Sequence, residues 1–222
     1  MKAIKKAFTF ILIFVLALGV AVSADSYTQT FKPGWNFIAF SHYPADTAVE
    51  SVFGSFDFAF DCVLQTMVGN ESASYDPFEE FSALSNVFLG QGYYFYTPEA
   101  GTISYEGVAD GIPDANGRMT DMWFELPKAG WQMIGNPFAH DVYVNADESD
   151  EGTGDHIFFT DGNVLKTWGE AVDADWVEDS FQNNEEQGLV SYSLGDSAKL
   201  IAGKGYYFKT NVDNLVMIIP AY

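Results

Sequence analysis

Lys32-Pro33-Gly34-Trp35-Asn36-Phe37-Ile38 is the stretch that decides the fold, because a variant of it returns 96 residues later as Lys128-Ala129-Gly130-Trp131-Gln132-Met133-Ile134. A second motif, Gly90-Gln91-Gly92-Tyr93-Tyr94-Phe95-Tyr96-Thr97, returns 113 residues later as Gly203-Lys204-Gly205-Tyr206-Tyr207-Phe208-Lys209-Thr210. The two motifs keep their order. The sequence therefore predicts two copies of one fold, with about 17 additional residues between the motifs of the second copy.

Glycines open the strands that both motifs predict. Gly34 and Gly130 precede a tryptophan and supply a turn conformation that a residue with a Cβ resists. The tryptophan that follows offers a large area to bury. Gly92 and Gly205 precede the aromatic strand, where we expect a tight turn or a β-bulge.

The aromatic motif also predicts which side chains face inward, because residues alternate between the two faces of a strand. Tyr93 and its copy Tyr206 stay aromatic, so we assign them to the core. Tyr94 and Tyr96 lie on the other face, where Lys209 takes the place of Tyr96 in the second copy. A lysine at that position indicates a face in contact with solvent.

The segments between the motifs predict further short strands. One hairpin turns at Gly69-Asn70, and the corresponding place in the second copy has a hairpin that turns at Asp161-Gly162-Asn163. A short helix is expected at Ala48–Phe53. An apolar strand, Leu215–Ile219, ends the second copy and matches 102–105 in the first. The predicted fold is all-β, with two tandem pseudo-repeats of antiparallel strands forming a sandwich or a partly open barrel with short helical turns.

Residues 1–24 have the three parts of a secretory signal peptide. Three lysines precede an apolar run, Phe8–Val22, and the small residues Val22-Ser23-Ala24 precede a cleavage site. The alternative is an uncleaved membrane anchor, although the run is short of the roughly 20 residues that span a bilayer. We expect a secreted protein, extracellular or at the cell surface with the periplasm as an alternative, and no membrane span in the mature chain.

The mature chain is predicted to have two repeat units and a linker. The first unit covers 25–108, and the second unit covers 120–222 and contains an acidic insertion. Turn-forming residues fill the linker at 109–119. Each unit is small for an independent core, so we expect the pair to pack as one body.

Composition excludes several classes of protein. The net charge is −21, and it becomes −24 when the signal peptide and its three lysines are removed. Such a chain lacks the basic surface that nucleic acids require. A single cysteine, Cys62, excludes an internal disulfide and a cysteine-based zinc site, and we expect it to be buried as a small hydrophobic residue.

The paired motifs resemble a β repeat of secreted and cell-surface prokaryotic proteins, in which a Gly-Trp-Asn strand opens the unit and a Gly-x-Gly-Tyr-Trp strand follows near its end. This chain has Gln132 instead of the second asparagine, and Tyr94 and Tyr207 instead of the expected tryptophans. The resemblance implies an extracellular β module that is often an accessory part of a larger surface protein. It implies no catalytic residues.

Aromatic side chains are one candidate for ligand binding, because flat rings on a sheet can stack on sugars. The alternative is that most of them fill the core. The candidate residues are Tyr94, Tyr96, Trp123, Trp168 and Trp176.

Acidic loops are candidates for binding calcium, which takes six to eight oxygen ligands. The candidate ligands in the acidic insertion are Asp147, Asp150, Glu151 and Asp155. The alternative is a solvated loop that keeps the protein soluble. A weaker candidate set lies in the linker and consists of Asp110, Asp114 and Asn116. A further acidic run follows the insertion and consists of Glu170, Asp173, Asp175, Glu178 and Asp179.

The remaining candidates for chemistry are weak. The histidines, His42, His140 and His156, lack the spacing of a zinc site. No nucleophile motif or dinucleotide fingerprint is present, and carboxylate pairs will arise by chance among 31 acidic residues. We therefore expect a protein that is not an enzyme, with a hydrolase that uses paired carboxylates as the least favoured alternative.

The sequence favours a secreted, non-catalytic protein with a structural, assembly or protein-interaction role. Its expected partners are other surface proteins or a second copy of itself, because the apolar strand Leu215–Ile219 suits edge pairing. The alternative is a carbohydrate-binding module that uses exposed aromatic residues, with calcium as a candidate cofactor.

Overall fold

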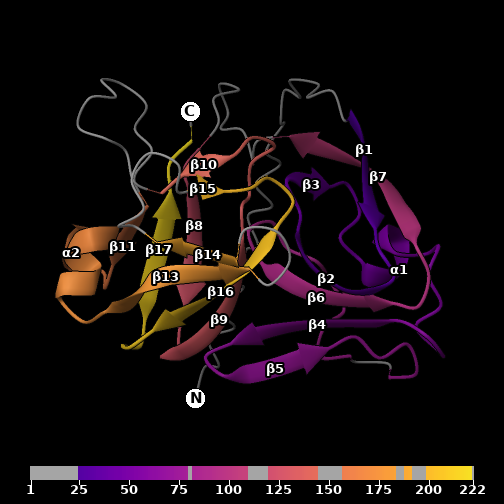
Figure 1. The fold of residues 1–222 in the computed structure, drawn as a ribbon, viewed down its shortest axis with the longest axis horizontal. Helices are drawn as coiled ribbons and strands as arrows, with labels where there is room; N and C mark the ends of the chain where they lie inside the picture. The colour runs from indigo at the N-terminus through magenta and orange to yellow at the C-terminus, as the bar shows by residue number, and fades with distance from the viewer. Residues whose placement is uncertain are drawn as a thin grey trace, which may run out of the picture.

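The computed structural model describes residues 25–79, 82–109, 120–144, 157–183, 188–191 and 199–221. The predicted signal peptide and 110–119 of the predicted linker lie outside the described residues. Within them the chain consists mainly of antiparallel strands with two short helices, which confirms the predicted all-β class. Figure 1 shows the first repeat unit, in indigo to magenta, beside the second unit, which runs from rose through orange to yellow.

The first unit is a sandwich of two sheets. One sheet has three strands in the order β1-β7-β3, and the other has four strands in the order β2-β6-β4-β5. The predicted helix is present as α1. The elements are β1 (Asp25–Phe31), β2 (Gly34–Ala39), β3 (His42–Pro44), α1 (Val49–Val52), β4 (Val63–Val68), β5 (Glu71–Ser74), β6 (Gly92–Thr97) and β7 (Gly101–Ala109).

The second unit repeats this arrangement with additions. Its sheets have the orders β12-β11-β17-β8 and β14-β13-β16-β9, and β10 pairs with β15. The elements are β8 (Met122–Leu126), β9 (Gly130–Gly135), β10 (Val142–Tyr143), β11 (Phe158–Thr160), β12 (Leu165–Thr167), α2 (Trp168–Asp173), β13 (Val177–Asn183), β14 (Gly188–Ser191), β15 (Lys199–Leu200), β16 (Gly205–Thr210) and β17 (Leu215–Ile219).

The strand pairing shows that the two units are copies of one fold. Strands β2-β6-β4-β5 of the first unit correspond to β9-β16-β13-β14 of the second. The cross-strand register is also the same, since Gly34 lies opposite Thr97 and Gly130 lies opposite Thr210. In both units the first strand pairs with the last, β1 with β7 and β8 with β17. The predicted duplication is confirmed.

Two expectations about strand pairing are wrong. The hairpin that turns at Asp161-Gly162-Asn163 is present as β11–β12, but the true counterpart of the β4–β5 hairpin is β13–β14. The β11–β12 hairpin is therefore part of the additional chain of the second unit. The apolar strand β17 is not an edge, because it is paired with β8 on one side and with β11 on the other.

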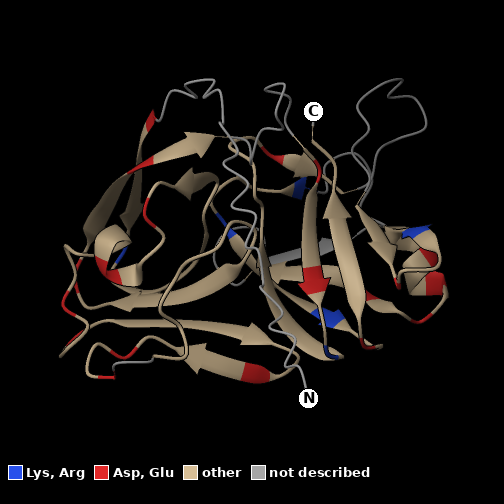
Figure 2. Ribbon diagram, turned by 180° about the vertical axis from the view of Figure 1, so that it is seen from behind, with Lys and Arg blue, Asp and Glu red and all other residues tan. Residues whose placement is uncertain are grey.

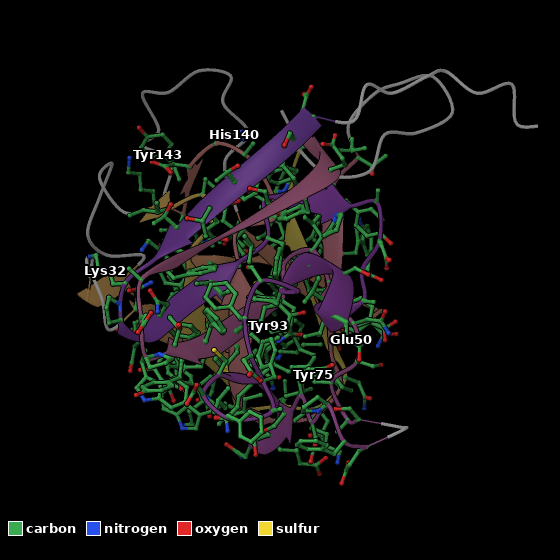
Figure 3. The ribbon with its side chains drawn as sticks, turned by 90° about the vertical axis from the view of Figure 1, so that its right-hand side faces the viewer. Lys32, Glu50, Tyr75, Tyr93, His140 and Tyr143 are labelled. Carbon is green, nitrogen blue, oxygen red and sulfur yellow. The ribbon has the colours of Figure 1, made fainter. Side chains whose placement is uncertain are left out.

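The inward assignments are confirmed. Tyr93 and Tyr206 are fully buried in two separate cores, and each core lies between the two sheets of its own unit. Figure 3 shows Tyr93 inside the first unit. The amide N–H of Phe88 donates to the Tyr93 hydroxyl at 2.7 Å, and the amide N–H of Ile201 donates to the Tyr206 hydroxyl at 2.8 Å. Equivalent side chains thus fill equivalent places.

Two of the four motif glycines have the expected role, and two have a different one. Gly34 and Gly130 have φ of 97° and 126°, as expected for a turn. Gly92 and Gly205 do not form the expected turn or bulge. A Cβ on Gly205 would lie 2.6 Å from the carbonyl oxygen of Ile38, and a Cβ on Gly92 would collide with the backbone of Ile134. Both positions need glycine because backbone from the other unit approaches closely.

The two units pack as one body through a joint with approximate two-fold symmetry. The amide N–H of Ala39, at the end of β2, donates to the carbonyl of Gly203 at 3.1 Å. The equivalent N–H of Gly135, at the end of β9, donates to the carbonyl of Gly90 at 2.7 Å. Each unit therefore gives the other the same pair of segments, as in an isologous dimer.

Candidate functional site

A band of aromatic rings follows the outward faces of two equivalent sheets, β2-β6-β4-β5 of the first unit and β9-β16-β13-β14 of the second. We call it the aromatic face, and it consists of Trp35, Tyr94, Tyr96, Trp131 and Tyr207. Trp35 stacks on Tyr94 with ring centroids 4.8 Å apart, and Tyr94 lies 6.1 Å from Tyr207 of the second unit. Tyr207 in turn meets Trp131 edge-on at 6.4 Å. The rings thus form a continuous path across the joint.

Glutamine amides accompany the aromatic face in both units. Gln65 of β4 lies opposite Tyr94, and Gln182 of β13 lies opposite Tyr207. A hollow of about 370 Å³ is lined by Gln182, Tyr207, Trp131 and Met67. Burial raises the pKa of Tyr207 above its ordinary value, with the nearby Tyr94 as a further cause, so its hydroxyl is neutral at physiological pH. The face therefore combines ring surfaces with neutral hydrogen-bonding groups.

A separate cleft lies where the first unit meets the free edge of β8, and we call it the inter-unit cleft. Its volume is about 380 Å³. Phe88 and Gln91 line it from the first unit, and Trp123 and Glu125 line it from the second. Trp123 is 61% exposed and Phe88 is 57% exposed, which is unusual for side chains of this size.

The structure divides the five predicted aromatic candidates. Tyr94 and Tyr96 are partly exposed on the aromatic face, and Trp123 lines the inter-unit cleft. Trp168 is wrong as a binding residue, because it is 2% exposed and packs on Phe181 with centroids 4.5 Å apart. Trp176 is partly exposed beneath the ammonium group of Lys166.

Four aromatic residues of these surfaces were not among the predicted binding residues: Trp35, Phe88, Trp131 and Tyr207. Trp35 was expected to be buried but is 45% exposed. Trp35 lies opposite Tyr96, whose side chain was assigned to the outward face. This pairing, had it been predicted, would have placed Trp35 on the outward face as well. Phe88 lies in a loop before Gly90, where no alternating pattern predicts the direction of a side chain.

The predicted calcium ligands cannot be placed. Asp147, Asp150, Glu151 and Asp155 lie outside the described residues, as do Asp110, Asp114 and Asn116 of the linker. Among the described residues, no group of three or more histidine, cysteine or acidic side chains is arranged so that it could hold a metal ion. Calcium binding by the acidic insertion stays a prediction.

The acidic run after the insertion has structural partners instead. Glu170 completes a capping box with Thr167 at the start of α2. Glu178 pairs with Lys209 at 2.8 Å, and Asp175 accepts a hydrogen bond from Asn211. Three of the five carboxylates of this run therefore have partners within the protein.

The two described histidines and the cysteine have packing partners. His42 stacks on Tyr27 at 4.3 Å and His140 stacks on Phe138 at 5.4 Å, while His156 lies outside the described residues. Cys62 is buried as expected, and desolvation raises the pKa of its thiol.

Carboxylates line several surface pockets of the first unit. A cavity of about 370 Å³ is lined in part by Asp57, Asp61 and Glu99, all of which are exposed. In a second pocket, Tyr75 donates to Glu50 at 2.9 Å, and burial together with this carboxylate raises the pKa of Tyr75 to about 12. Figure 3 shows these two side chains together at one edge of the unit. Cys62 also lines the first pocket, and burial raises the pKa of its thiol. That the protein is not an enzyme stays a prediction.

The surface is acidic throughout. Figure 2 shows Asp and Glu distributed over both units, whereas lysine is sparse. Lys128, Lys199 and Lys209 each pair with a carboxylate. No lysine or arginine lines the inter-unit cleft in the described part of the chain.

Comparison with protein-family models, with curated proteins and with solved structures gave no match. None of the helices in the described ranges has the length and apolar character needed to cross a bilayer.

Proposed function

We propose that the protein is a secreted, non-catalytic carbohydrate-binding protein that acts at or beyond the cell surface. The observation that carries the proposal is the aromatic face, which runs across both units. Its rings follow one another at centroid distances of 4.8 to 6.4 Å. An extended glycan chain can lie along such a path and contact several rings at once.

Ring stacking suits sugars because the axial C–H groups of a pyranose form an apolar patch that packs on a π face. The hydroxyl groups at the rim of the sugar need hydrogen-bonding partners. Gln65 and Gln182 each offer an amide with two donors and an acceptor beside a tyrosine ring. The same combination is present in both units, so the face offers repeated contacts to a repeating polymer.

Charge favours a neutral polysaccharide. With a net charge of −24 after removal of the signal peptide, the mature protein repels anionic chains at low salt. Lys209 is the lysine next to the aromatic face, and its ammonium group is paired with Glu178. The face therefore has no unpaired cation among the described residues that would attract a uronate or a sulfate.

A pull-down of the mature protein on insoluble cellulose, xylan, mannan and chitin tests the proposal. We expect at least one polysaccharide to retain the protein, and we expect Trp35→Ala with Tyr94→Ala to reduce retention at least tenfold. Tyr43→Ala is the matched control, because Tyr43 is an exposed tyrosine on β3, away from the aromatic face. Equal retention of the double variant and the wild type would refute the role of the face.

A second candidate is a role in assembly with other surface proteins or with a second copy of the chain. The observation that favours it is strand β12, an edge strand that presents an exposed Leu165 next to an exposed Val164. Edge strands with apolar side chains are sites of strand addition. Light scattering during size-exclusion tests it, and a monomer whose mass does not change with concentration would count against self-assembly.

A further inference from the structure

We propose that the inter-unit cleft is a second carbohydrate site, which holds one neutral sugar ring against the two exposed aromatic residues of its lining, Trp123 and Phe88. The inference rests on the proposed function for its class of ligand, but it uses none of the residues of the aromatic face. The cleft volume of about 380 Å³ lies within the range of small-molecule sites, roughly 300–1,000 Å³. Clefts between packed units are a common place for such sites.

The duplicated fold provides an internal control for the aromatic residues of the cleft. By strand register, Thr28 of β1 is the counterpart of Trp123 of β8. Ile201 is the counterpart of Phe88, since the N–H groups of both donate to a buried tyrosine hydroxyl. The other half of the joint thus folds with a threonine and an isoleucine, so the shared fold does not require Trp123 and Phe88.

The polar residues of the cleft differ between the halves in the same way. By strand register, Glu125 corresponds to Thr30. Gln91 corresponds to Lys204, because Gln91 forms a β-bridge with Ile134 and Lys204 forms one with the equivalent residue, Ile38. Lys204 would attract anions in the other half of the joint, whereas the cleft has the carboxylate of Glu125 and the amide of Gln91. The cleft therefore has its own chemistry, distinct from that of its pseudo-symmetric counterpart.

Gln91 lines the cleft, and hydrogen bonds hold its amide in a fixed orientation. Its Nε2 donates to the carbonyl oxygen of Met133 and to the hydroxyl oxygen of Thr66, both at 2.5 Å. A carbonyl oxygen can only accept, so these contacts identify the nitrogen and leave Oε1 as the remaining acceptor. No described residue donates to Oε1, and a sugar hydroxyl can do so. Glu125, which is exposed, adds two acceptor oxygens to the lining.

These groups select a neutral ligand. The cleft offers acceptors to hydroxyl donors and two large ring surfaces to C–H groups, and the carboxylate of Glu125 repels an anion. A neutral pyranose has both the apolar face and the hydroxyl donors that this lining complements.

Titration calorimetry with soluble oligosaccharides tests the cleft directly. The probes are cellohexaose, xylohexaose, mannohexaose and chitohexaose, each added to the mature protein.

The variants Trp123→Thr and Phe88→Ile introduce the residues that the other half of the joint already has at the equivalent positions, so both should fold. We expect Trp123→Thr to weaken binding at least tenfold and Phe88→Ile to weaken it less, with urea midpoints close to that of the wild type. Glu125→Thr should also weaken binding, and Thr28→Ala is the matched control that should leave affinity within twofold.

The same titrations separate this inference from the proposed function. If Trp123→Thr binds as tightly as the wild type while the Trp35→Ala and Tyr94→Ala double variant binds more weakly, the proposal of a sugar site in the cleft is refuted. The proposal that the aromatic face binds carbohydrate is then supported. If only Trp123→Thr loses binding, the cleft is supported and the role of the aromatic face is refuted. A wild-type protein that binds none of the four oligosaccharides and none of the four polysaccharides overturns both.

Discussion

At the scale of single residues, the duplication separates side chains that the fold needs from those that it does not. Tyr93 and Tyr206 are fully buried, and the hydroxyl of each accepts a backbone N–H from the loop before it. Burial raises the pKa of both phenols above their ordinary value, so both are neutral at physiological pH. In contrast, Trp123 has a threonine as its counterpart.

Replacement of either buried tyrosine by phenylalanine should destabilise the protein by a similar amount. Tyr93→Phe leaves the N–H of Phe88 without its partner, and Tyr206→Phe does the same to Ile201. An unsatisfied N–H costs about 1–3 kcal/mol, and urea unfolding measures the change. A loss at one site with no change at the other would contradict the equivalence of the two units.

A buried amide explains one departure from the motif. The Asn36 side chain donates to the carbonyl of Lys32, and the Gln132 side chain donates to the equivalent carbonyl of Lys128. The Gln132 oxygen also accepts the N–H of Gly69 at 2.9 Å. The longer glutamine thus keeps the local bond of asparagine and adds one across the joint.

At the scale of secondary-structure elements, local patterns predicted more than pairing did. The alternation around Tyr93 and the Asp161-Gly162 turn depend on near neighbours, and both predictions were confirmed. The assignment of β17 as an edge was wrong, because the strands beside it come from 122–126 and 158–160. Strand order depends on contacts between distant segments, which local periodicity does not contain.

The candidate site shows the same limit. Tyr94 and Tyr96 could be assigned outward from alternation alone, whereas the exposure of Trp168 was predicted wrongly. Trp168 begins helix α2, and its indole N–H donates to the carbonyl of Glu178 on β13. The inter-unit cleft could not be predicted, because its lining comes from four separate segments, 67–68, 88–91, 123–126 and 132–134, which meet across the joint.

Helix α2 should depend on its capping box. The Thr167 hydroxyl accepts the N–H of Glu170, and the Glu170 carboxylate accepts the N–H of Thr167. Thr167→Ala should lower the free energy of unfolding by about 1 kcal/mol, as measured by urea denaturation. Thr167→Ser keeps the hydroxyl and should restore most of the stability, and an equal loss in both variants would argue against a capping role.

At the scale of the whole molecule, the joint makes two small sandwiches into one body. Met122 of the second unit packs against both cores, and the equivalent hydrogen bonds of Ala39 and Gly135 cross between the units. A domain of about 80–100 residues buries a modest fraction of its surface. The joint therefore adds stability that neither unit has alone, and it also forms the walls of the inter-unit cleft.

The glycines of the joint should be the most sensitive test of this arrangement. Gly92→Ala and Gly205→Ala each push a Cβ into backbone of the other unit, which the neighbouring strand cannot move aside. We expect each to destabilise the protein by about 1–3 kcal/mol or more. Gly162→Ala is the control, because Gly162 lies in a turn with no heavy atom within 4 Å of the new Cβ, and it should cost only about 1 kcal/mol of backbone strain.

The Gly92→Ala and Gly205→Ala double variant should lose less stability than the sum of the two single losses, because one substitution already opens the joint that the other would disturb. Strictly additive losses, or two separate unfolding transitions in the wild type, would instead mean that the units unfold independently.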